Sequence, residues 1–444
     1  MSGGTGNGLP TARMLQEVVE FTAALIRIDS TNSGDPAAIR DGESRCALLI
    51  RDLLAEVGVA GEWYERTPGR GNLVCRIAGQ DRSLPGLLLH AHTDTVPADP
   101  ELWTANPWGG EIHAGELWGR GAVDMKNMIG MLLAAIRDLR GESWTPARDI
   151  VLAFVADEEV ESTDGMAFLV DEHPEAFAGV TEAIGEVGGF SFETPTGRNY
   201  AIGIGEKAVA WATLRSIGTE GHGSLVPNDE NPAARLSSAL ARIVEHSWPF
   251  ADNEAAQTTL QYLGASLGYE VTAENVAQQT QQLGVIASML SSAFRTSSAL
   301  TQFHAGSKTN TVPGTAVATV DCRIAPGFEA EFHRQFRELL GPDIDVSWEE
   351  APGVTAPYGT ALTEAISQAI ANVDPEAGAL PFVTGGATDA KALSRLGILC
   401  YGFVPLRLPP EFNFPGMFHG IDERVPISAL HTGTEILREF LRSQ

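Results

Sequence analysis

The chain has 444 residues, of which 43% are hydrophobic, and it carries a formal net charge of −27 at pH 7. This length exceeds what one hydrophobic core usually supports, so we expect at least two domains. The negative charge argues against binding to nucleic acid or to an anionic membrane, and no apolar run reaches the roughly 20 residues that span a bilayer.

The N-terminal residues and the cysteines indicate where the protein works. Residues 1–14 contain no basic segment followed by an apolar core, which a secretory signal needs. The four cysteines are far apart and form no CxxC pair, which argues against a disulfide framework or a cysteine zinc site. We therefore expect a cytoplasmic protein.

The first part of the chain alternates helical and strand patterns. Helical spacing runs from Ala12 to Ile28 and from Ser44 to Gly58. Strands are expected at residues 61–65, 72–77 and 86–89. The last of these is an apolar run that ends abruptly in the tripeptide His-Thr-Asp. In an open α/β sheet, ligands bind beyond the carboxyl ends of the strands, so this end is a candidate for chemistry.

His92 and Asp94 are the first candidate pair. Residues two apart in an extended chain point to the same side, so Asp94 can accept a hydrogen bond from the ring nitrogen that His92 does not use for a metal. A loop histidine and a turn-forming aspartate before a proline would give the same tripeptide. On these residues alone, both interpretations remain open.

Acidic residues occur at three further ends of expected elements. Asp124 precedes a long helix that begins near Met125, whose N-terminal amides favour negative charge. The other acids follow two buried strands: Asp157, Glu158, Glu159 and Glu186. One acidic strand end is usually a solvated turn, but four candidate ends in succession indicate a shared metal or catalytic site.

From residue 205 the pattern changes. An alternating strand at residues 207–218 precedes an amphipathic helix at 231–247, and a strand and a helix recur further on, at 314–324 and 329–341. The pattern predicts an inserted α+β domain over residues 205–343, which divides the main domain into residues 1–204 and 344–444. Residues 252–301 have helical periodicity, and we expect them to decorate the inserted domain as a helical lid.

The last hundred residues return to the first pattern. A helical stretch at residues 360–373 is followed by the glycine-rich loop Thr384–Asp389 and by a strand at 398–405. The tripeptide Phe-His-Gly at residues 418–420 precedes a final helix at 426–442. The main domain is therefore expected to be α/β in both of its parts.

Eight motifs occur in order over nearly the whole chain: HAHTDTVP, GRGAVDMK, ADEE, GEVGG, GHGS, KTNTVPG with DCR, GGATD and FHG. Together they resemble the di-zinc metallopeptidase family of aminoacylase, glutamate carboxypeptidase, acetylornithine deacetylase and succinyl-diaminopimelate desuccinylase. The resemblance implies a zinc-exopeptidase-like mixed sheet flanked by helices. It also implies that the inserted domain forms the contact of a homodimer.

The resemblance implies a ligand set for two zinc ions per subunit. One site corresponds to His92, Asp124 and Glu186, and the other to Asp124, Glu159 and His419, so that Asp124 bridges the two. Imidazoles and carboxylates suit zinc in a two-metal site. Cobalt or manganese can satisfy the same ligands.

The resemblance also assigns catalytic roles. Glu158 corresponds to the general base that moves a proton from the metal-bridging water to the leaving nitrogen, and Asp94 to the residue that orients His92. His222 corresponds to a histidine that reaches the active site of the partner subunit and donates a hydrogen bond to the developing oxyanion. In relatives the peptide bond after the bridging aspartate is cis, so a cis bond is expected after Asp124.

Substrate-binding residues follow from the same comparison. Asn310 and Arg323 correspond to residues that hold the substrate carboxylate, which the planar fork of arginine binds well. Gly385, Gly386 and Thr388 are expected to line the same pocket through backbone amides and a hydroxyl.

These assignments imply a hydrolase that cleaves an amide bond next to a free carboxylate, in a dipeptide or an N-acyl amino acid, by attack of a metal-bridging hydroxide. Two alternatives remain open. One is a deacylase dedicated to a biosynthetic intermediate, and the other is a protein that kept the fold for binding and lost catalysis. The presence of all five ligands together with Glu158 argues against the second.

Overall fold

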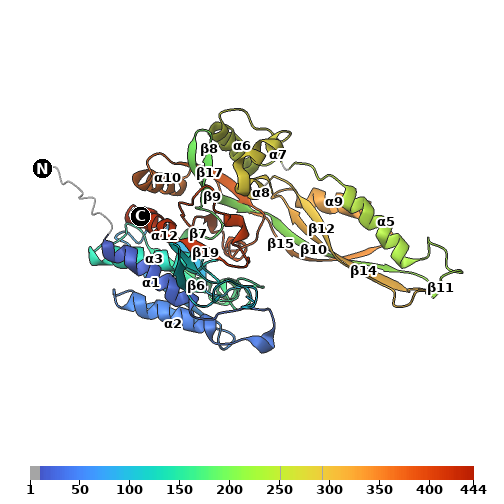
Figure 1. Ribbon diagram of the computed structural model, residues 1–444, viewed down its shortest axis with the longest axis horizontal. Helices are drawn as coiled ribbons and strands as arrows, with labels where there is room; N and C mark the ends of the chain where they lie inside the picture. The colour runs from blue at the N-terminus through green and yellow to red at the C-terminus, as the bar shows by residue number, and fades with distance from the viewer. Residues whose placement is uncertain (1–10, 251, 293) are drawn as a thin grey trace.

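The computed structural model describes residues 11–250, 252–292 and 294–444. Residues 1–10, part of the stretch without a recognisable signal, lie outside the described residues. The molecule is elongated, with a main body and a projecting arm (Figure 1). Among the helices in the described ranges, none is long and apolar enough to cross a membrane.

A mixed sheet lies at the centre of the main body, as the sequence predicts. Its middle is formed by three parallel neighbours, β6 (Ile150–Val155), β3 (Gly86–His92) and β7 (Val180–Gly185). β3 is buried along its whole length because its side chains alternate between two cores, one on each face of the sheet. The sheet is completed by β1 (Gly61–Glu65), β2 (Gly71–Ile77), β8 (Ser191–Thr194), β9 (Gly197–Glu206), β16 (Val354–Thr355), β17 (Gly378–Thr384) and β18 (Leu399–Gly402).

Helices cover both faces of this sheet. The smaller core lies under α4 (Met166–Glu172) and α11 (Ala390–Ser394). The larger core includes the apolar sides of five longer helices, α1 (Ala12–Ile26), α2 (Gly42–Ala55), α3 (Lys126–Gly141), α10 (Ala361–Val373) and α12 (Ile427–Arg442). A small sheet completes the main body, with strands β4 (Glu111–His113), β5 (Glu116–Trp118) and β19 (Arg424–Pro426).

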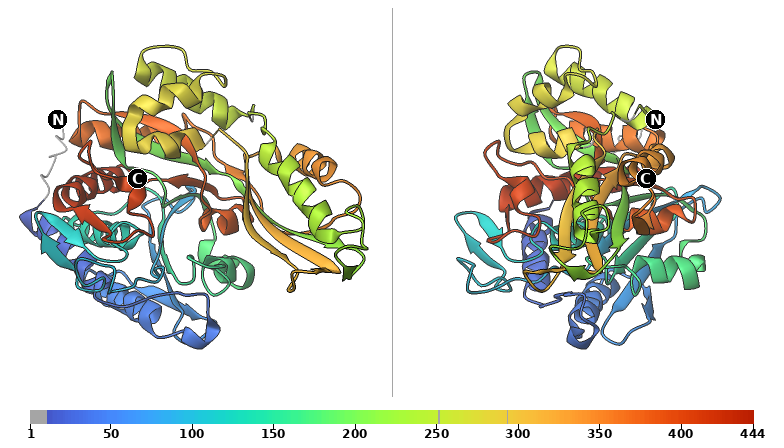
Figure 2. Two further views of the ribbon diagram at one scale, coloured as in Figure 1. Left: turned by 45° about the vertical axis from the view of Figure 1, so that its right-hand side comes forward. Right: turned by 90° about the vertical axis from the view of Figure 1, so that its right-hand side faces the viewer.

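The arm contains a separate antiparallel sheet with its own core. Figure 2 shows α5 (Pro232–Glu245) and α9 (Glu329–Leu340) along one face of this sheet. At the outer tip, β11 (Gly221–His222) pairs with β13 (Thr311–Val312). The strand order is β12 (Ser297–Ala305), β14 (Thr315–Ile324), β10 (Ala208–Ile217) and β15 (Asp345–Ala351).

The segment predicted as a helical lid on the inserted domain lies elsewhere. Its helices α6 (Glu254–Leu267), α7 (Val276–Gln279) and α8 (Ala287–Ser292) belong to the main body, where α6 and α8 contact β17. Apolar side chains such as Leu260 and Leu263 are buried in the larger core. The prediction of a lid on the inserted domain is therefore wrong, because the amphipathic helices bury their apolar sides against the main sheet.

The end of the inserted domain also differs from the prediction. β15 pairs with β10 of the arm, and the chain rejoins the main sheet only at β16. The main domain therefore resumes after Ala351 rather than at residue 344. Lys391 links the two chain segments that run between the main body and the arm. Its Nζ donates hydrogen bonds to the carbonyls of Lys207 at 2.7 Å and Pro352 at 2.8 Å.

Candidate metal centre

The carboxyl ends of the three parallel central strands meet at one edge of the main sheet. His92 is the last residue of β3, Glu158 and Glu159 follow the end of β6, and Glu186 follows β7. Because these strands are parallel neighbours, residues that follow their ends are brought together. The three strand ends lie far apart in the sequence, but the topology places them at one site.

Two groups of side chains there can each hold a metal ion. In the first group, His92 Nε2 lies 3.1 Å from Asp124 Oδ1 and 3.7 Å from Glu186 Oε2. In the second, His419 Nε2 lies 3.0 Å from Glu159 Oε2 and 3.3 Å from Asp124 Oδ2. Asp124 thus offers one oxygen to each group. The structure brings together both ligand sets that the sequence resemblance implied.

The electrostatics of these groups fit bound cations. Burial raises the pKa of Glu186 to about 7, and the neighbouring Asp124 and Glu159 add to this effect. Burial also raises the pKa of Asp124, but hydrogen bonds with His419 and His92 lower it by more, so that its pKa lies below the usual range. Oε1 of Glu159 is buried without a hydrogen-bond partner among the described residues. Crowded carboxylates with an unused oxygen suit divalent metal ions.

The loop that carries Asp124 is held by a residue that the sequence did not suggest. Glu423 is fully buried, and its carboxylate accepts hydrogen bonds from the amides of Gly121, Val123 and Asp124 at 2.7 to 3.0 Å. Nη1 of Arg120 donates to it at 2.7 Å. The peptide bond from Asp124 to Met125 is cis, as expected.

Asp94 joins two parts of the site. Its backbone carbonyl lies 3.1 Å from His92 Nδ1, and its carboxylate Oδ1 lies 3.4 Å from the same nitrogen. The carboxylate also accepts hydrogen bonds from the backbone amides of Glu158 at 3.2 Å and Glu159 at 3.1 Å. The predicted contact with His92 therefore involves the carbonyl more closely than the carboxylate, and the carboxylate also holds the turn after β6.

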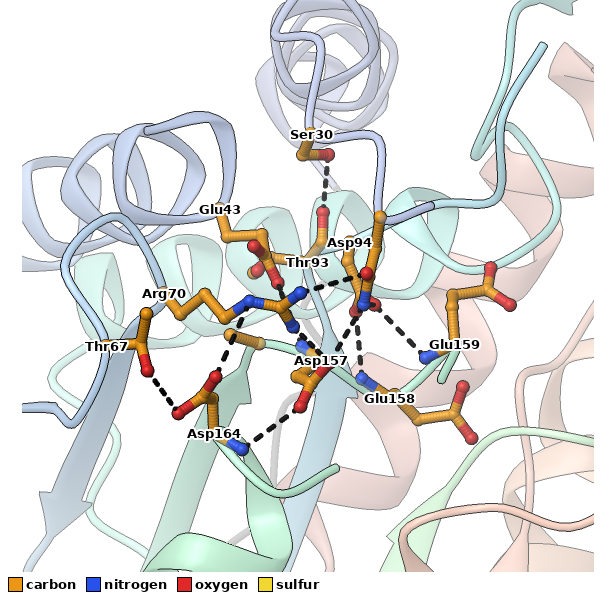
Figure 3. A network of polar contacts seen from close by, with 12 residues as sticks. Ser30, Glu43, Thr67, Arg70, Thr93, Asp94, Asp157, Glu158, Glu159 and Asp164 are labelled. Carbon is orange, nitrogen blue, oxygen red and sulfur yellow. Dashed lines mark hydrogen bonds and ion pairs between the residues drawn. The ribbon is translucent and has the colours of Figure 1, made fainter. Parts of the chain in front are cut away.

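Glu158 lies beside the ligands without belonging to either group. Its Oε2 is 3.9 Å from His92 Nε2, and its side chain diverges from that of Glu159 (Figure 3). Burial raises the pKa of Glu158 well above its ordinary value, and the nearby Glu186 adds to this effect. A carboxylate in this position can exchange protons with a group at the metal centre.

A cavity of about 800 Å³ opens over the centre. This volume lies in the usual range for small-molecule sites. Arg323 and Trp211 of the arm sheet face the cavity, together with four of the candidate ligands, Asp124, Glu159, Glu186 and His419. The cavity is therefore bounded by both the main body and the arm.

The glycine-rich loop contributes differently from the prediction. Gly386 and Thr388 line the cavity, whereas Gly385 lies outside its lining. The amide of Gly386 donates to Thr384 Oγ1 at 3.2 Å, and both the amide and the hydroxyl of Thr388 donate to buried Glu206. These donors are already used within the protein, and the two from Thr388 satisfy a buried carboxylate, which requires hydrogen bonds. Two of the three predicted residues, Gly386 and Thr388, therefore line the cavity, whereas Gly385 does not.

Asp389 is a second residue that sequence reasoning missed, although it ends the quoted GGATD motif. It is buried in the cavity wall, and its Oδ1 accepts a hydrogen bond from Ser162 Oγ at 2.7 Å. Burial raises the pKa of Asp389 to about 7.

His222 and Asn310 lie together, but away from the metal centre of their own chain. Both are exposed at the tip of the arm, where the amide of Gly223 donates to the Asn310 carbonyl at 3.0 Å. The ring of His222 contacts Ser224 Oγ at 2.9 Å. Figure 1 shows β11, which contains His222, at the far end of the arm. Neither residue lines the cavity.

The chain matches known proteins over most of its length, including both the main body and the arm. The family model described as "Peptidase family M20/M25/M40" matches residues 88–443. N-fatty-acyl-amino acid synthase/hydrolase PM20D1 of Mus musculus is 27% identical over 397 residues, which cover 83% of this chain and 76% of that protein. Aminoacylase-1 of Sus scrofa is 26% identical and covers 88% of each chain. The solved structure of the M20 family metallo-carboxypeptidase Sso-CP2 from Sulfolobus solfataricus aligns with a TM-score of 0.72 at 18% identity, over 96% of this chain and 98% of that one.

Proposed function

Because this chain belongs to peptidase family M20/M25/M40 and is a metal-dependent hydrolase of peptide or amide bonds, we propose that its substrates carry a free carboxylate beside the cleaved bond. Dipeptides and N-acyl amino acids are the substrates of this kind. The family identified from the eight sequence motifs is confirmed. One observation carries the proposal on substrates, namely that Arg323 lines the same cavity as the candidate ligands.

Arg323 is suited to hold that carboxylate. Its Nε donates to Asp321 Oδ1 at 2.8 Å and its Nη2 to Asp321 Oδ2 at 3.2 Å, so the guanidinium is already oriented. A guanidinium held in this way recognises a second carboxylate with little loss of side-chain freedom. The names of the relatives support the same class, since they include an aminoacylase and a hydrolase of N-fatty-acyl amino acids.

We propose that two zinc ions are held by His92, Asp124 and Glu186 and by Asp124, Glu159 and His419. When bound, they supply Lewis-acid polarisation and generate the nucleophile from water. Glu158 takes a proton from the attacking water and passes it to the leaving nitrogen. Its raised pKa makes it a stronger base than an ordinary carboxylate.

Within this substrate class, the cavity favours substrates that carry an apolar acyl group. The larger apolar side chains in its wall are Val160, Val187, Val209, Trp211 and Phe418. An N-acyl amino acid with an extended acyl chain would bury its apolar surface there. This observation keeps a dedicated deacylase as a second candidate beside a dipeptidase.

The test is hydrolysis of dipeptides and N-acyl amino acids, each compared with its C-terminal carboxamide. We expect at least one acid to be cleaved, and its carboxamide to lose about 10- to 100-fold in kcat/KM, because hydrogen bonds to charged groups contribute more than neutral ones. Steady-state kinetics of the zinc-loaded protein measure this ratio. Equal cleavage of the acid and the carboxamide would contradict the proposed substrate class.

We further propose a cytoplasmic homodimer in which the tip of each arm supplies His222 and Asn310 to the partner's centre. The exposure of both residues and their distance from their own cavity support this arrangement. His222 would then donate a hydrogen bond to the developing oxyanion. The free thiols of all four cysteines support a reducing compartment.

Mixing two inactive variants tests the shared site. His222→Ala and Glu158→Gln are each expected to be nearly inactive. A mixed dimer contains one intact site out of two, so the purified mixed dimer should have about half of the wild-type activity. Differently tagged subunits, purified as mixed dimers after joint expression, provide the measurement. An inactive mixed dimer, or a fully active His222→Ala protein, would contradict the arrangement.

A further inference from the structure

Asp157 is the first of the three acids after β6, and the metal centre does not use it. Its side chain points away from those of Glu158 and Glu159 and into a buried polar network around Arg70 (Figure 3). Asp157 is 4% exposed, and its backbone is in the left-handed region, with φ at 62°. A residue with a side chain rarely adopts this conformation unless its surroundings hold it there.

Arg70 is the cation at the centre of this network. It is 5% exposed, and its Nη1 forms an ion pair with Asp157 Oδ1. The same nitrogen lies 3.8 Å from Glu43 Oε1, and Nε lies 3.6 Å from Asp164 Oδ2. A single buried guanidinium therefore stands among three carboxyl groups, and its loss would leave buried negative charge without compensation.

Asn32 connects this network to the metal centre. Its Oδ1 accepts a hydrogen bond from Arg70 Nη2 at 3.0 Å. Its Nδ2 lies 3.0 Å from Asp157 Oδ1 and 3.0 Å from Asp94 Oδ2, and donates to both. The orientation of the Asn32 amide is therefore fixed by Arg70 on one side and by two carboxylates on the other.

The network ends at the backbone of the proposed base. Asp94 accepts the amide hydrogens of Glu158 and Glu159 on its two oxygens, and the left-handed turn at Asp157 directs both amides toward it. Consecutive amides that converge on one anion form a recognised backbone nest. The position of the Glu158 side chain thus depends on Asp157 and Asp94, and both are held through Arg70.

Glu43 is a further carboxyl group that contacts Asp157 and Arg70. The amide of Asp157 donates to Glu43 Oε1 at 2.9 Å. Burial raises the pKa of Glu43 to about 8, and the charge of Asp94 adds to this effect. Glu43 thus contacts both the backbone of Asp157 and, at 3.8 Å, the guanidinium of Arg70.

We propose that Arg70 is a positioning residue that sets the placement of Glu158 through Asp157, Asn32 and Asp94. Arg70 does not line the cavity, so we expect its effect to reach the reaction through Asp94 and the turn after β6. The expected effect of Arg70 on kcat rests on the proposed function. Its structural consequence, the ordering of the turn, can be measured without any substrate.

The test compares Arg70→Ala with Arg66→Ala. Arg66 is an exposed neighbour that pairs with Glu172 and donates to the backbone carbonyl of Thr163, so it reaches the edge of the network but not its buried ion pairs. We expect Arg70→Ala to lower kcat about 10- to 100-fold, as changes behind a metal centre do, with a much smaller change in KM. Added guanidinium, at concentrations that leave the fold intact, should restore part of kcat, and urea should not.

Hydrogen exchange of the peptide around residues 156–162 provides the readout that needs no activity. Arg70→Ala should exchange faster there, and guanidinium should restore the protection, whereas Arg66→Ala should match the wild type. If Arg70→Ala does not fold, Arg70→Lys serves instead, because it keeps the charge but lacks the planar fork that contacts Asp157 and Asn32 through separate nitrogens. Wild-type exchange and wild-type kcat in a folded Arg70 variant would overturn the inference. A wild-type protein that cleaves no substrate would count against the proposed function only.

Discussion

Replacing Glu158 by Gln should lower kcat by about 10² to 10⁴, the usual contribution of a general base. Glutamine keeps the size and hydrogen-bonding shape of the side chain but cannot take up a proton. Because Glu158 belongs to neither ligand group, the variant should bind as much metal as the wild type. Steady-state kinetics, together with metal analysis by mass spectrometry, separates the loss of the base from the loss of the metal.

Glu161→Gln is the matched control for this experiment. Glu161 is an exposed acid in the same turn and faces the same cavity. It should keep kcat close to the wild-type value. Two outcomes would remove Glu158 from the proposed role, namely an active Glu158→Gln protein or an equal loss in both variants.

Replacing Asp124 by Asn should weaken metal binding at both groups at once. Asp124 offers one oxygen to each group, and a neutral amide is a poorer ligand than a carboxylate. The bound metal should fall well below that of the wild type, and activity should fall to that of the chelator-treated protein. Glu186→Gln is the comparison, because it changes only the group of His92 and should leave the other metal site occupied.

Metal titration followed by dialysis and elemental analysis gives the stoichiometry of each variant. The shared role of Asp124 requires Asp124→Asn to lose more metal than Glu186→Gln. Equal retention in the two variants would mean that Asp124 does not bridge the groups. Circular dichroism of both proteins confirms that the fold is kept, so that a loss of metal reports on the ligand.

The place of the site could be predicted because its signals are local, whereas the division of the ligands into two sets followed from the family resemblance. His92, Glu159 and Glu186 each follow an apolar run that reads as a buried strand, and parallel neighbours bring such ends together. Glu423 gave no such signal, since it lies in the polar stretch Ile-Asp-Glu-Arg, which is typical of an exposed turn. Its partners lie about 300 positions earlier in the chain.

The placement of the 252–301 segment failed for a different reason. Periodicity shows that a helix has an apolar side, but it does not show which core receives that side. Leu260 of α6 would fit either part of the molecule by its sequence pattern, and only the three-dimensional packing assigns it to the main body. Arg70 and Asn32 were missed because a buried polar network is defined by contacts between distant segments.

The return of α6, α7 and α8 to the main body limits how the arm can be exchanged. The chain leaves the main sheet after β9, comes back for these helices, leaves again for β12 and returns at β16. An arm transplanted between relatives as one continuous piece would take the helices that cover β17 with it and expose the apolar surface beneath them. Replacing the arm alone therefore requires the exchange of two separate segments, with four junctions between old and new sequence.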